Sequence, residues 1–342
     1  MNIFITGNTG YIGSFLSPYL IKKNKNFNII GYDSGFFRDN LTKNIKPEKK
    51  LKKQYLEDIR FIKSSHLYEV NTIIHLCGLS NDPIGKKFEK VTNEINYKAS
   101  VKLFKHALKN NVKKFIFASS CSSYGFGGKI IKTENSKINP LTAYARSKVK
   151  FENYLKKNKN KGIEIIILRF ATACGDSPRL RLDLVLNDFV YSAVKEKKII
   201  IKSNGKPLRP LIDVEDMCKI IDWSIKKKNK NFLLINAGSN INNYSVKEIA
   251  LKVQTVLGNK VKILLDDTLP DDKRSYKVNF NKLNKNFKNF KAKPLNKTIL
   301  QLKKSIQTMK KFKNKKTELI RLNYLGSLIK KGKLTKQLIW KK

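Results

Sequence analysis

A tyrosine and a lysine stand four residues apart in the stretch Tyr144-Ala145-Arg146-Ser147-Lys148. On a helix, this spacing places both side chains on one face. A free phenol has a pKa of about 10, which is too high for a base at neutral pH. A neighbouring ammonium group favours the phenolate and draws that pKa toward the working range. The pair therefore predicts a tyrosine general base supported by a lysine.

Ser120 comes shortly after an apolar run, Lys113–Ala118, that we expect to form a buried strand. Ligands of parallel sheets bind beyond the carboxyl ends of the strands. A hydroxyl there can bridge a substrate oxygen and the tyrosine. The order of a strand-end serine and then Tyr-x-x-x-Lys is more specific than the pair alone. We therefore predict that Ser120, Tyr144 and Lys148 form one active site.

Glycines at every third position follow the first apolar run, Asn2–Thr6, and precede a helical pattern. Such glycines let the backbone turn tightly and approach a pyrophosphate, and the helix N-terminus supplies oriented N–H groups. The spacing is G-x-x-G-x-x-G, whereas long-chain dehydrogenases carry G-x-G-x-x-G. The expected cofactor contacts in this turn are Gly7, Gly10, Tyr11, Ile12 and Gly13.

Asp33 follows the second apolar run, Phe27–Tyr32. A carboxylate at that strand tip would bind the adenosine ribose hydroxyls and repel a 2′-phosphate, which favours NAD over NADP. Arg38 is the nearby residue that weakens this prediction, and a turn cap is the alternative role of Asp33. Asp58 and Ile59 are candidates for the adenine edge, with a solvated Asp58 as the alternative.

These residues must be positioned by alternating strands and helices. Short, nearly continuous apolar runs predict strands that are buried on both faces, and apolar residues at helical spacing separate them. This alternation predicts an α/β fold with a doubly wound, Rossmann-type parallel sheet. The expected strands are Asn2–Thr6, Phe27–Tyr32, Thr72–Leu76, Lys113–Ala118 and Ile163–Leu168, and the expected helices are Tyr11–Lys23, Phe88–Asn110 and Thr142–Lys157.

The alternation loosens after about residue 170, where loops with proline and glycine appear. We expect a nucleotide-binding domain over residues 1–170 and a smaller substrate-binding lobe over residues 171–310, interleaved with the last sheet strands. Residues 311–342 should form a lysine-rich linker and a helical tail from Thr317 that docks on the body. Helices in this second half of the chain are expected near Leu182–Lys195, Val214–Lys226 and Ser245–Leu257.

Over about residues 1–310 the sequence resembles the extended short-chain dehydrogenase/reductases of the NAD-dependent sugar-nucleotide epimerase/dehydratase group. The matching pieces are Thr6–Gly13, Asp33, His75–Gly78, Asn96, Ala118–Gly125, Tyr144–Lys148, Leu168–Phe170, Arg209–Asp216 and Arg274–Val278. The resemblance implies a Ser120, Tyr144 and Lys148 triad, with Lys148 also holding the nicotinamide ribose. It further implies cofactor contacts at Leu76 and Asn96.

The same resemblance implies that Arg209 and Arg274 clamp the diphosphate of a nucleotide-sugar substrate, with Asn187 contacting it. Only nine of the 72 basic residues are arginines, so an arginine retained here is expected to serve bidentate phosphate binding. Arg179 and Arg181 line the same pocket or, equally, form surface ion pairs.

The residues after Ser120 bear on the reaction. Dehydratases of this family carry an Asp-Glu pair there, and this chain has Cys121 and Ser122. Without that acid and base, elimination of water is disfavoured. We therefore expect 4-epimerisation through a transient 4-keto sugar with tightly bound NAD. A nucleotide-sugar dehydrogenase or reductase, or a dehydratase, is the alternative, and Cys121 either packs or acts as an acid/base.

The formal net charge of +46 suggests a nucleic-acid-binding, non-catalytic relative as a further alternative. Lysine runs spread over the whole chain instead indicate compositional drift, so we expect no nucleic-acid partner. No apolar stretch approaches the ~20 residues that span a bilayer, and no signal peptide is apparent. Four scattered cysteines predict neither a metal site nor disulfides and favour the cytoplasm. The family resemblance also implies a homodimer, whose interface the helices Phe88–Asn110 and Thr142–Lys157 would supply.

Overall fold

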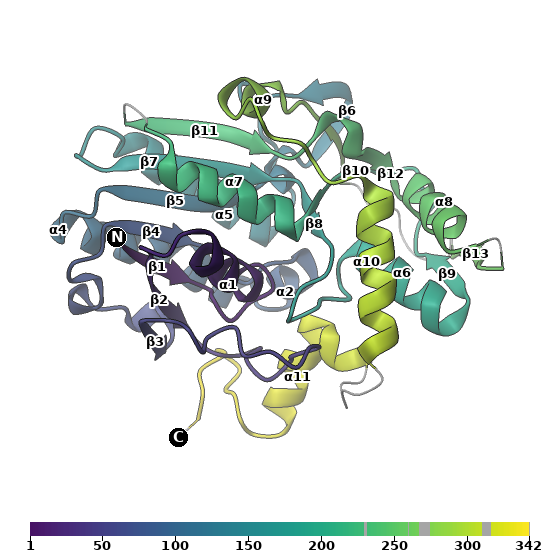
Figure 1. Ribbon diagram of the computed structural model, residues 1–342, viewed down its shortest axis with the longest axis horizontal. Helices are drawn as coiled ribbons and strands as arrows, with labels where there is room; N and C mark the ends of the chain where they lie inside the picture. Colours follow the sequence, from purple (N-terminus) through teal and green to yellow (C-terminus); the bar gives the residue numbers. More distant parts are fainter. Residues whose placement is uncertain (229–230, 259, 267–273, 310–315, 342) are drawn as a thin grey trace.

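The computed structural model describes residues 1–342 except 229–230, 259, 267–273, 310–315 and 342. Its centre is a seven-stranded, wholly parallel sheet with the order β11-β7-β5-β4-β1-β2-β3 (Figure 1). This confirms the predicted doubly wound fold. The strands are β1 (Asn2–Thr6), β2 (Asn28–Asp33), β3 (Lys53–Leu56), β4 (Thr72–His75), β5 (Lys114–Ser120), β7 (Glu164–Phe170) and β11 (Phe232–Ala237).

Helices cover both faces of this sheet. On one face α1 (Gly13–Lys23) and α7 (Val214–Lys226) pack together (Figure 1), and their buried side chains share a core with β1, β5 and β7. On the other face lie α4 (Ala99–Lys109) and α5 (Ala143–Lys157), whose Phe104 and Phe151 pack on β5. Burial on both faces explains why the strands are continuously apolar.

The predicted helix Phe88–Asn110 is divided in the structure. It consists of α3 (Glu89–Asn93), one π-helical turn over Glu94–Lys98, and α4. The turn carries Asn96, whose buried amide bonds to the backbone of Leu79. π turns of this kind often occur at functional sites. The preceding loop also contains a short helix, α2 (Asp82–Lys87), which the sequence analysis did not predict.

A smaller lobe stands beyond the carboxyl end of the sheet, on the right of Figure 1. Its helices share one core that includes Leu186, Val190, Ile249 and Ile299. These helices are α6 (Val185–Glu196), α8 (Val246–Leu257) and α10 (Leu295–Thr308), whereas α9 (Asn281–Asn286) packs against β11 and buries Leu283 in the core of the central sheet. The strands form three small sheets: β8 (Thr172–Cys174), β10 (Leu208–Asp213) and β12 (Asn243–Ser245); β9 (Lys198–Ile201) and β13 (Lys262–Leu265); β6 (Phe126–Lys132) and β14 (Ser275–Val278).

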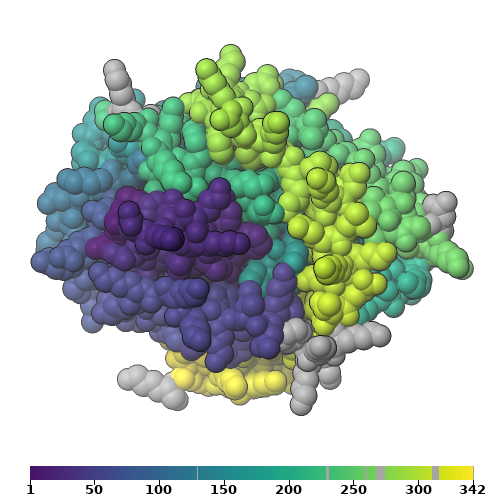
Figure 2. Space-filling view, in the orientation of Figure 1, coloured from purple at the N-terminus to yellow at the C-terminus, as the bar shows by residue number. Residues whose placement is uncertain are grey.

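The C-terminal segment returns to the first half of the chain. It contains α11 (Arg321–Lys330) and ends in a single bridge between Leu334 and Trp340. Leu325 and Leu338 are buried in the same core as α4 and α5. Figure 2 shows this segment along the lower edge of the molecule. Most of the predicted lysine-rich linker lies outside the described residues.

No helix among the described residues is long and apolar enough to cross a membrane.

Candidate active site

The glycine turn forms a close-fitting cradle between β1 and α1. Gly7 has a φ of +78°, and a Cβ there would lie 2.8 Å from the backbone nitrogen of Cys77. A Cβ on Gly13 would overlap the carbonyl oxygen of Gly7. The N-terminus of α1 has no side-chain cap and no acidic residue in its first turn. Its orphan N–H groups therefore suit a phosphate.

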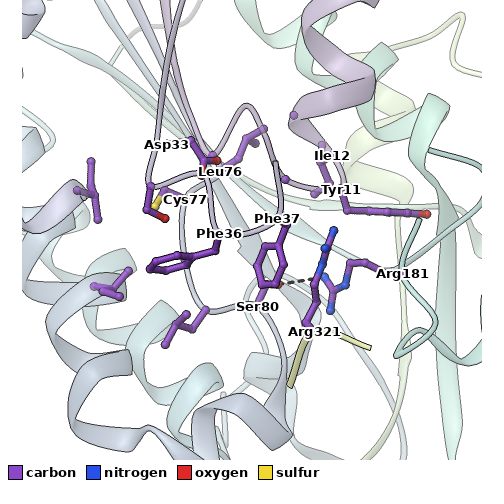
Figure 3. A pocket seen from close by; sticks show the side chains of 18 of the residues that line it. Tyr11, Ile12, Asp33, Phe36, Phe37, Leu76, Cys77, Ser80, Arg181 and Arg321 are labelled. Carbon is purple, nitrogen blue, oxygen red and sulfur yellow. Dashed lines mark hydrogen bonds between the residues drawn. The ribbon is translucent and has the colours of Figure 1, made fainter. Parts of the chain in front are cut away.

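One cavity opens beside this turn (Figure 3). Asp33 stands at its wall, with its carboxylate accepting hydrogen bonds from the backbone of Thr9 (3.1 Å) and Gly35 (2.8 Å). Burial raises the pKa of this carboxyl group. Arg38 is exposed and does not line the cavity. The predicted cofactor contacts that line it are Gly7, Gly10, Tyr11, Ile12, Gly13, Asp33, Asp58, Ile59 and Leu76.

The side chains of Asp58 and Asn96, two of the predicted cofactor residues, are hydrogen-bonded within the protein. The Asp58 carboxylate accepts a hydrogen bond from the Arg60 backbone (2.9 Å) and pairs with its guanidinium (2.6 Å). Asn96 does not line the cavity, because its amide is bonded to both backbone groups of Leu79 and to the Ser147 hydroxyl (3.1 Å). Asn96 therefore fixes the loop after β4 against α5, which shapes the cavity wall.

The cavity also has lining residues that the sequence analysis did not assign to it. Ser34, Phe36 and Phe37 follow Asp33 directly, so their closeness to that strand tip was the available signal. No local signal pointed to Arg321, which lies in the C-terminal helix. The remaining unassigned residues are Cys77, Gly78, Leu79, Ser80 and Ile95.

The three predicted catalytic residues meet at the end of β5 and the start of α5. Thr142 caps α5 by accepting a hydrogen bond from the backbone of Ala145 (3.2 Å), which places Tyr144 in the first turn. The Ser120 hydroxyl lies close enough to Tyr144 to lower the pKa of its phenol. The Lys148 ammonium donates to the Ala118 carbonyl (2.8 Å) and lies 5.9 Å from the centroid of the Tyr144 ring.

Burial dominates the protonation of this group. It raises the pKa of Tyr144, while the nearby hydroxyl of Ser120 and the charge of Arg181 lower it. It also lowers the pKa of Lys148 to about 8, against the smaller effects of Cys77 and Glu152. In the protein alone, Arg181 is thus the cation that favours the phenolate, and the lysine titrates near the physiological range.

A buried polar network fixes the strand end that carries Ser120. Arg169 on β7 pairs with Glu152 on α5 (2.6 Å), and both side chains are almost fully buried. Glu152 also accepts a hydrogen bond from Ser119, and Arg169 donates to the hydroxyl of Tyr124 (3.1 Å). Because every member has a partner, the network holds β5, β7 and α5 in one arrangement.

The two residues after Ser120 have buried polar atoms. Cys121 is fully buried, and its thiol donates to the Arg169 carbonyl (3.1 Å). Burial raises the pKa of this thiol, which makes it a poor acid or base. The Ser122 hydroxyl is buried without a hydrogen-bond partner among the described residues. The packing alternative for Cys121 is therefore the one that its surroundings favour.

The predicted substrate arginines lie side by side at the lobe. Arg209 on β10 donates to the carbonyl of Arg274, and its guanidinium is 5.8 Å from the centroid of the Tyr276 ring. The Arg274 guanidinium pairs with Asp82 of α2. Tyr276 is close enough to Tyr144 for the two hydroxyls to interact electrostatically. The two arginines and the predicted catalytic tyrosine are thus all near Tyr276.

The other polar candidates are placed differently. Asn187 is fully buried, accepts a hydrogen bond from the backbone of Gly175 (2.9 Å) and donates to the Arg181 carbonyl (3.0 Å). Arg179 is fully buried and paired with Glu48 (2.7 Å). Arg181 pairs with Asp183 (2.7 Å) and lines the cavity beside Tyr11. Of the two arginines, only Arg181 lines that cavity.

The residues present fit a dinucleotide. The turn has no room for side chains at Gly7 and Gly13, the uncapped helix end suits a diphosphate, and Asp33 suits ribose hydroxyls. Among the described residues, no group of three or more His, Cys, Asp or Glu side chains could hold a metal ion.

Comparisons with known proteins agree with this geometry. A sequence model of the NAD dependent epimerase/dehydratase family matches residues 3–238. An uncharacterized UDP-glucose epimerase, YtcB of Bacillus subtilis (strain 168), is 29% identical over 284 residues, which cover 79% of this chain and 86% of that protein. A dTDP-D-glucose 4,6-dehydratase of Dictyostelium discoideum is 29% identical over 248 residues, 66% of this chain and 55% of that protein.

Solved structures share the fold. A UDP-glucuronic acid 4-epimerase from Bacillus cereus, in complex with UDP-glucuronic acid and NAD, superposes with a TM-score of 0.79 at 22% identity. The match covers 90% of this chain and 100% of that one.

Proposed function

The chain belongs to the NAD dependent epimerase/dehydratase family, and on that premise we propose that it is a nucleotide-sugar 4-epimerase with tightly bound NAD. One observation carries the choice of reaction. The Ser120 hydroxyl at the strand end is near enough to Tyr144 to lower its pKa, whereas the two positions after Ser120 hold a buried cysteine and a serine. Proton transfer at one hydroxyl is thereby supported, and elimination of water is not.

In this proposal Tyr144 accepts the proton of the sugar C4 hydroxyl and later returns it. The Ser120 hydroxyl donates a hydrogen bond to the phenolate and orients the sugar oxygen. Arg181 adds a positive charge that stabilises the phenolate, as its effect on the pKa of Tyr144 indicates. When bound, NAD supplies a reversible hydride acceptor for the sugar carbon.

Arg209 and Arg274 would hold the diphosphate of the substrate. They are adjacent at the lobe, and both are near Tyr276, which is close enough to Tyr144 to interact with it electrostatically. A diphosphate would compete with Asp82 for the guanidinium of Arg274. We infer that substrate binding exchanges this ion pair for a bidentate phosphate contact, for which arginine geometry is suited.

The test is to incubate the purified protein with UDP-, GDP-, CDP- and dTDP-hexoses and follow the products by NMR and mass spectrometry. An epimerase yields an isomer of unchanged mass with no net formation of NADH. Tyr144→Phe should abolish turnover while NAD stays bound, and Arg146→Gln on the exposed side of the same helix is the matched control. NADH accumulating in proportion to product would overturn the proposal in favour of a dehydrogenase.

Other reactions of the family give different products. A product lighter by one water would indicate a dehydratase, as one relative is named, and a product heavier by two hydrogens would indicate a reductase. Either product, formed as the main one, contradicts 4-epimerisation.

We also propose that the enzyme is a homodimer through α4 and α5, which light scattering of the purified protein tests. Its four cysteines are free, which supports a reducing compartment such as the cytoplasm.

A further inference from the structure

The C-terminal segment, residues 316–341, lies along the rim of the cavity that Asp33 lines. The Trp340 indole donates to the Ser34 carbonyl (2.6 Å), and Arg60 donates to the carbonyls of Gln337 and Leu338 (both 3.0 Å). The match to the family model ends at residue 238, so the family assignment does not rest on this segment. Its contacts nevertheless reach both loops that bear the predicted adenosine-binding residues.

One side chain of this segment enters the cavity (Figure 3). Arg321, the first residue of α11, is only 2% exposed, and its guanidinium stacks 3.9 Å from the centroid of the Phe37 ring. Nη2 donates to the Arg179 carbonyl (3.3 Å). Nη1 is buried and has no hydrogen-bond partner within the described part of the chain.

Neighbouring arginines already have carboxylate partners. Arg179 is paired with Glu48 and Arg181 with Asp183. Burial and the charge of Arg181 lower the pKa of the Arg321 guanidinium to about 9. A buried cation without a matching anion is costly, and arginine remains there only if something compensates it. The cavity itself is the place from which an anion could do so.

The position of the cavity identifies the anion. Its opposite wall is the turn of Gly10, Tyr11 and Ile12 at the uncapped start of α1, which suits a diphosphate. Asp33, farther along the wall, would repel a 2′-phosphate. We propose that Arg321 binds the diphosphate of NAD and that residues 316–341 cover one side of the bound cofactor. This inference rests on the NAD site of the proposed function.

The test compares wild type with Arg321→Gln, Arg321→Lys and the control Arg38→Gln, an exposed arginine outside the cavity. NAD retained through purification is quantified, and the affinities of the nucleotide-stripped proteins for NAD, NADP and adenosine are measured by calorimetric titration. Loss of a charge-assisted contact should weaken NAD binding by Arg321→Gln about 10- to 100-fold. Adenosine, which lacks phosphates, should bind all variants equally, and Arg38→Gln should match wild type.

Thermal unfolding of the stripped proteins separates this role from a structural one. Arg321→Gln removes an unpaired buried charge, so its unfolding midpoint should equal or exceed that of wild type. Unchanged NAD affinity in Arg321→Gln would overturn the inference while leaving the NAD site intact. Weaker binding of NADP alone would assign Arg321 to a 2′-phosphate instead. Wild type that binds neither dinucleotide would refute the cofactor site itself.

Discussion

Replacing Lys148 by methionine should make the nucleotide-free protein more stable at neutral pH while it abolishes turnover. The lysine is buried on α5. Among the described residues its ammonium has one hydrogen bond, to the Ala118 carbonyl, and it lies 4.7 Å from the centroid of the Phe117 ring. Burial lowers its pKa from 10.5 to about 8. Methionine has a similar length and no charge to desolvate, so the fold loses an unfavourable charge and keeps its packing.

The magnitude follows from the pKa. A shift from 10.5 to about 8 corresponds to about 3 kcal/mol against the charged form. The lost hydrogen bond to Ala118 offsets about 1 kcal/mol, and the lost contact with the Phe117 ring about 0.5 to 1 kcal/mol. The net gain is then roughly 1 to 2 kcal/mol. Between pH 8 and 10.5 the unfolded chain binds more protons than the native one. The free energy of unfolding of wild type therefore rises with pH in that window.

Urea denaturation of both stripped proteins at several pH values measures this. The advantage of Lys148→Met should be full below about pH 8 and should disappear as the pH approaches 10.5. Lys150→Met, an exposed lysine on the same helix, is the matched control and should show no such pH dependence. A Lys148→Met variant that is less stable than wild type at pH 7, or whose difference does not change with pH, would refute the reasoning.

Three further substitutions test the site and its support. Gly13→Ala puts a Cβ against the Gly7 carbonyl oxygen, so the turn must open; NAD affinity should fall at least about tenfold in calorimetric titration, and unaltered affinity would contradict the cradle. Glu152→Gln leaves the buried Arg169 cation uncompensated and should lower the free energy of unfolding by about 3 to 5 kcal/mol in urea; a loss below ~1 kcal/mol would show that the pair is not needed. Asp33→Asn removes the charge that would oppose a 2′-phosphate; the ratio of the NAD and NADP dissociation constants should shift toward NADP about tenfold, and an unchanged ratio would mean that another residue sets the preference.

Much of the fold was predictable because its signals are local. β1 and α7 have the predicted bounds, and the other predicted strands differ by one or two residues at their ends. Glycines before a helix, a capped helix start and continuous apolar runs are properties of neighbouring residues. Two sheet strands were not predicted because they lack a clear local signal. β3 is an edge strand with half-exposed, mixed residues, and β11 follows a lysine-rich stretch.

Residue types and spacing alone indicated the glycine cradle, Asp33 at a strand tip and the Ser…Tyr-x-x-x-Lys group, because each needs only a strand end or one helix face. Tertiary structure decided which cations act there. The charge of Arg181, rather than that of Lys148, lowers the pKa of Tyr144. Arg321, from the C-terminal helix, stacks on Phe37 near the start of the chain. Such contacts join residues that are far apart in the sequence and depend on how the folded elements pack together. Neither periodicity nor local propensity encodes that packing.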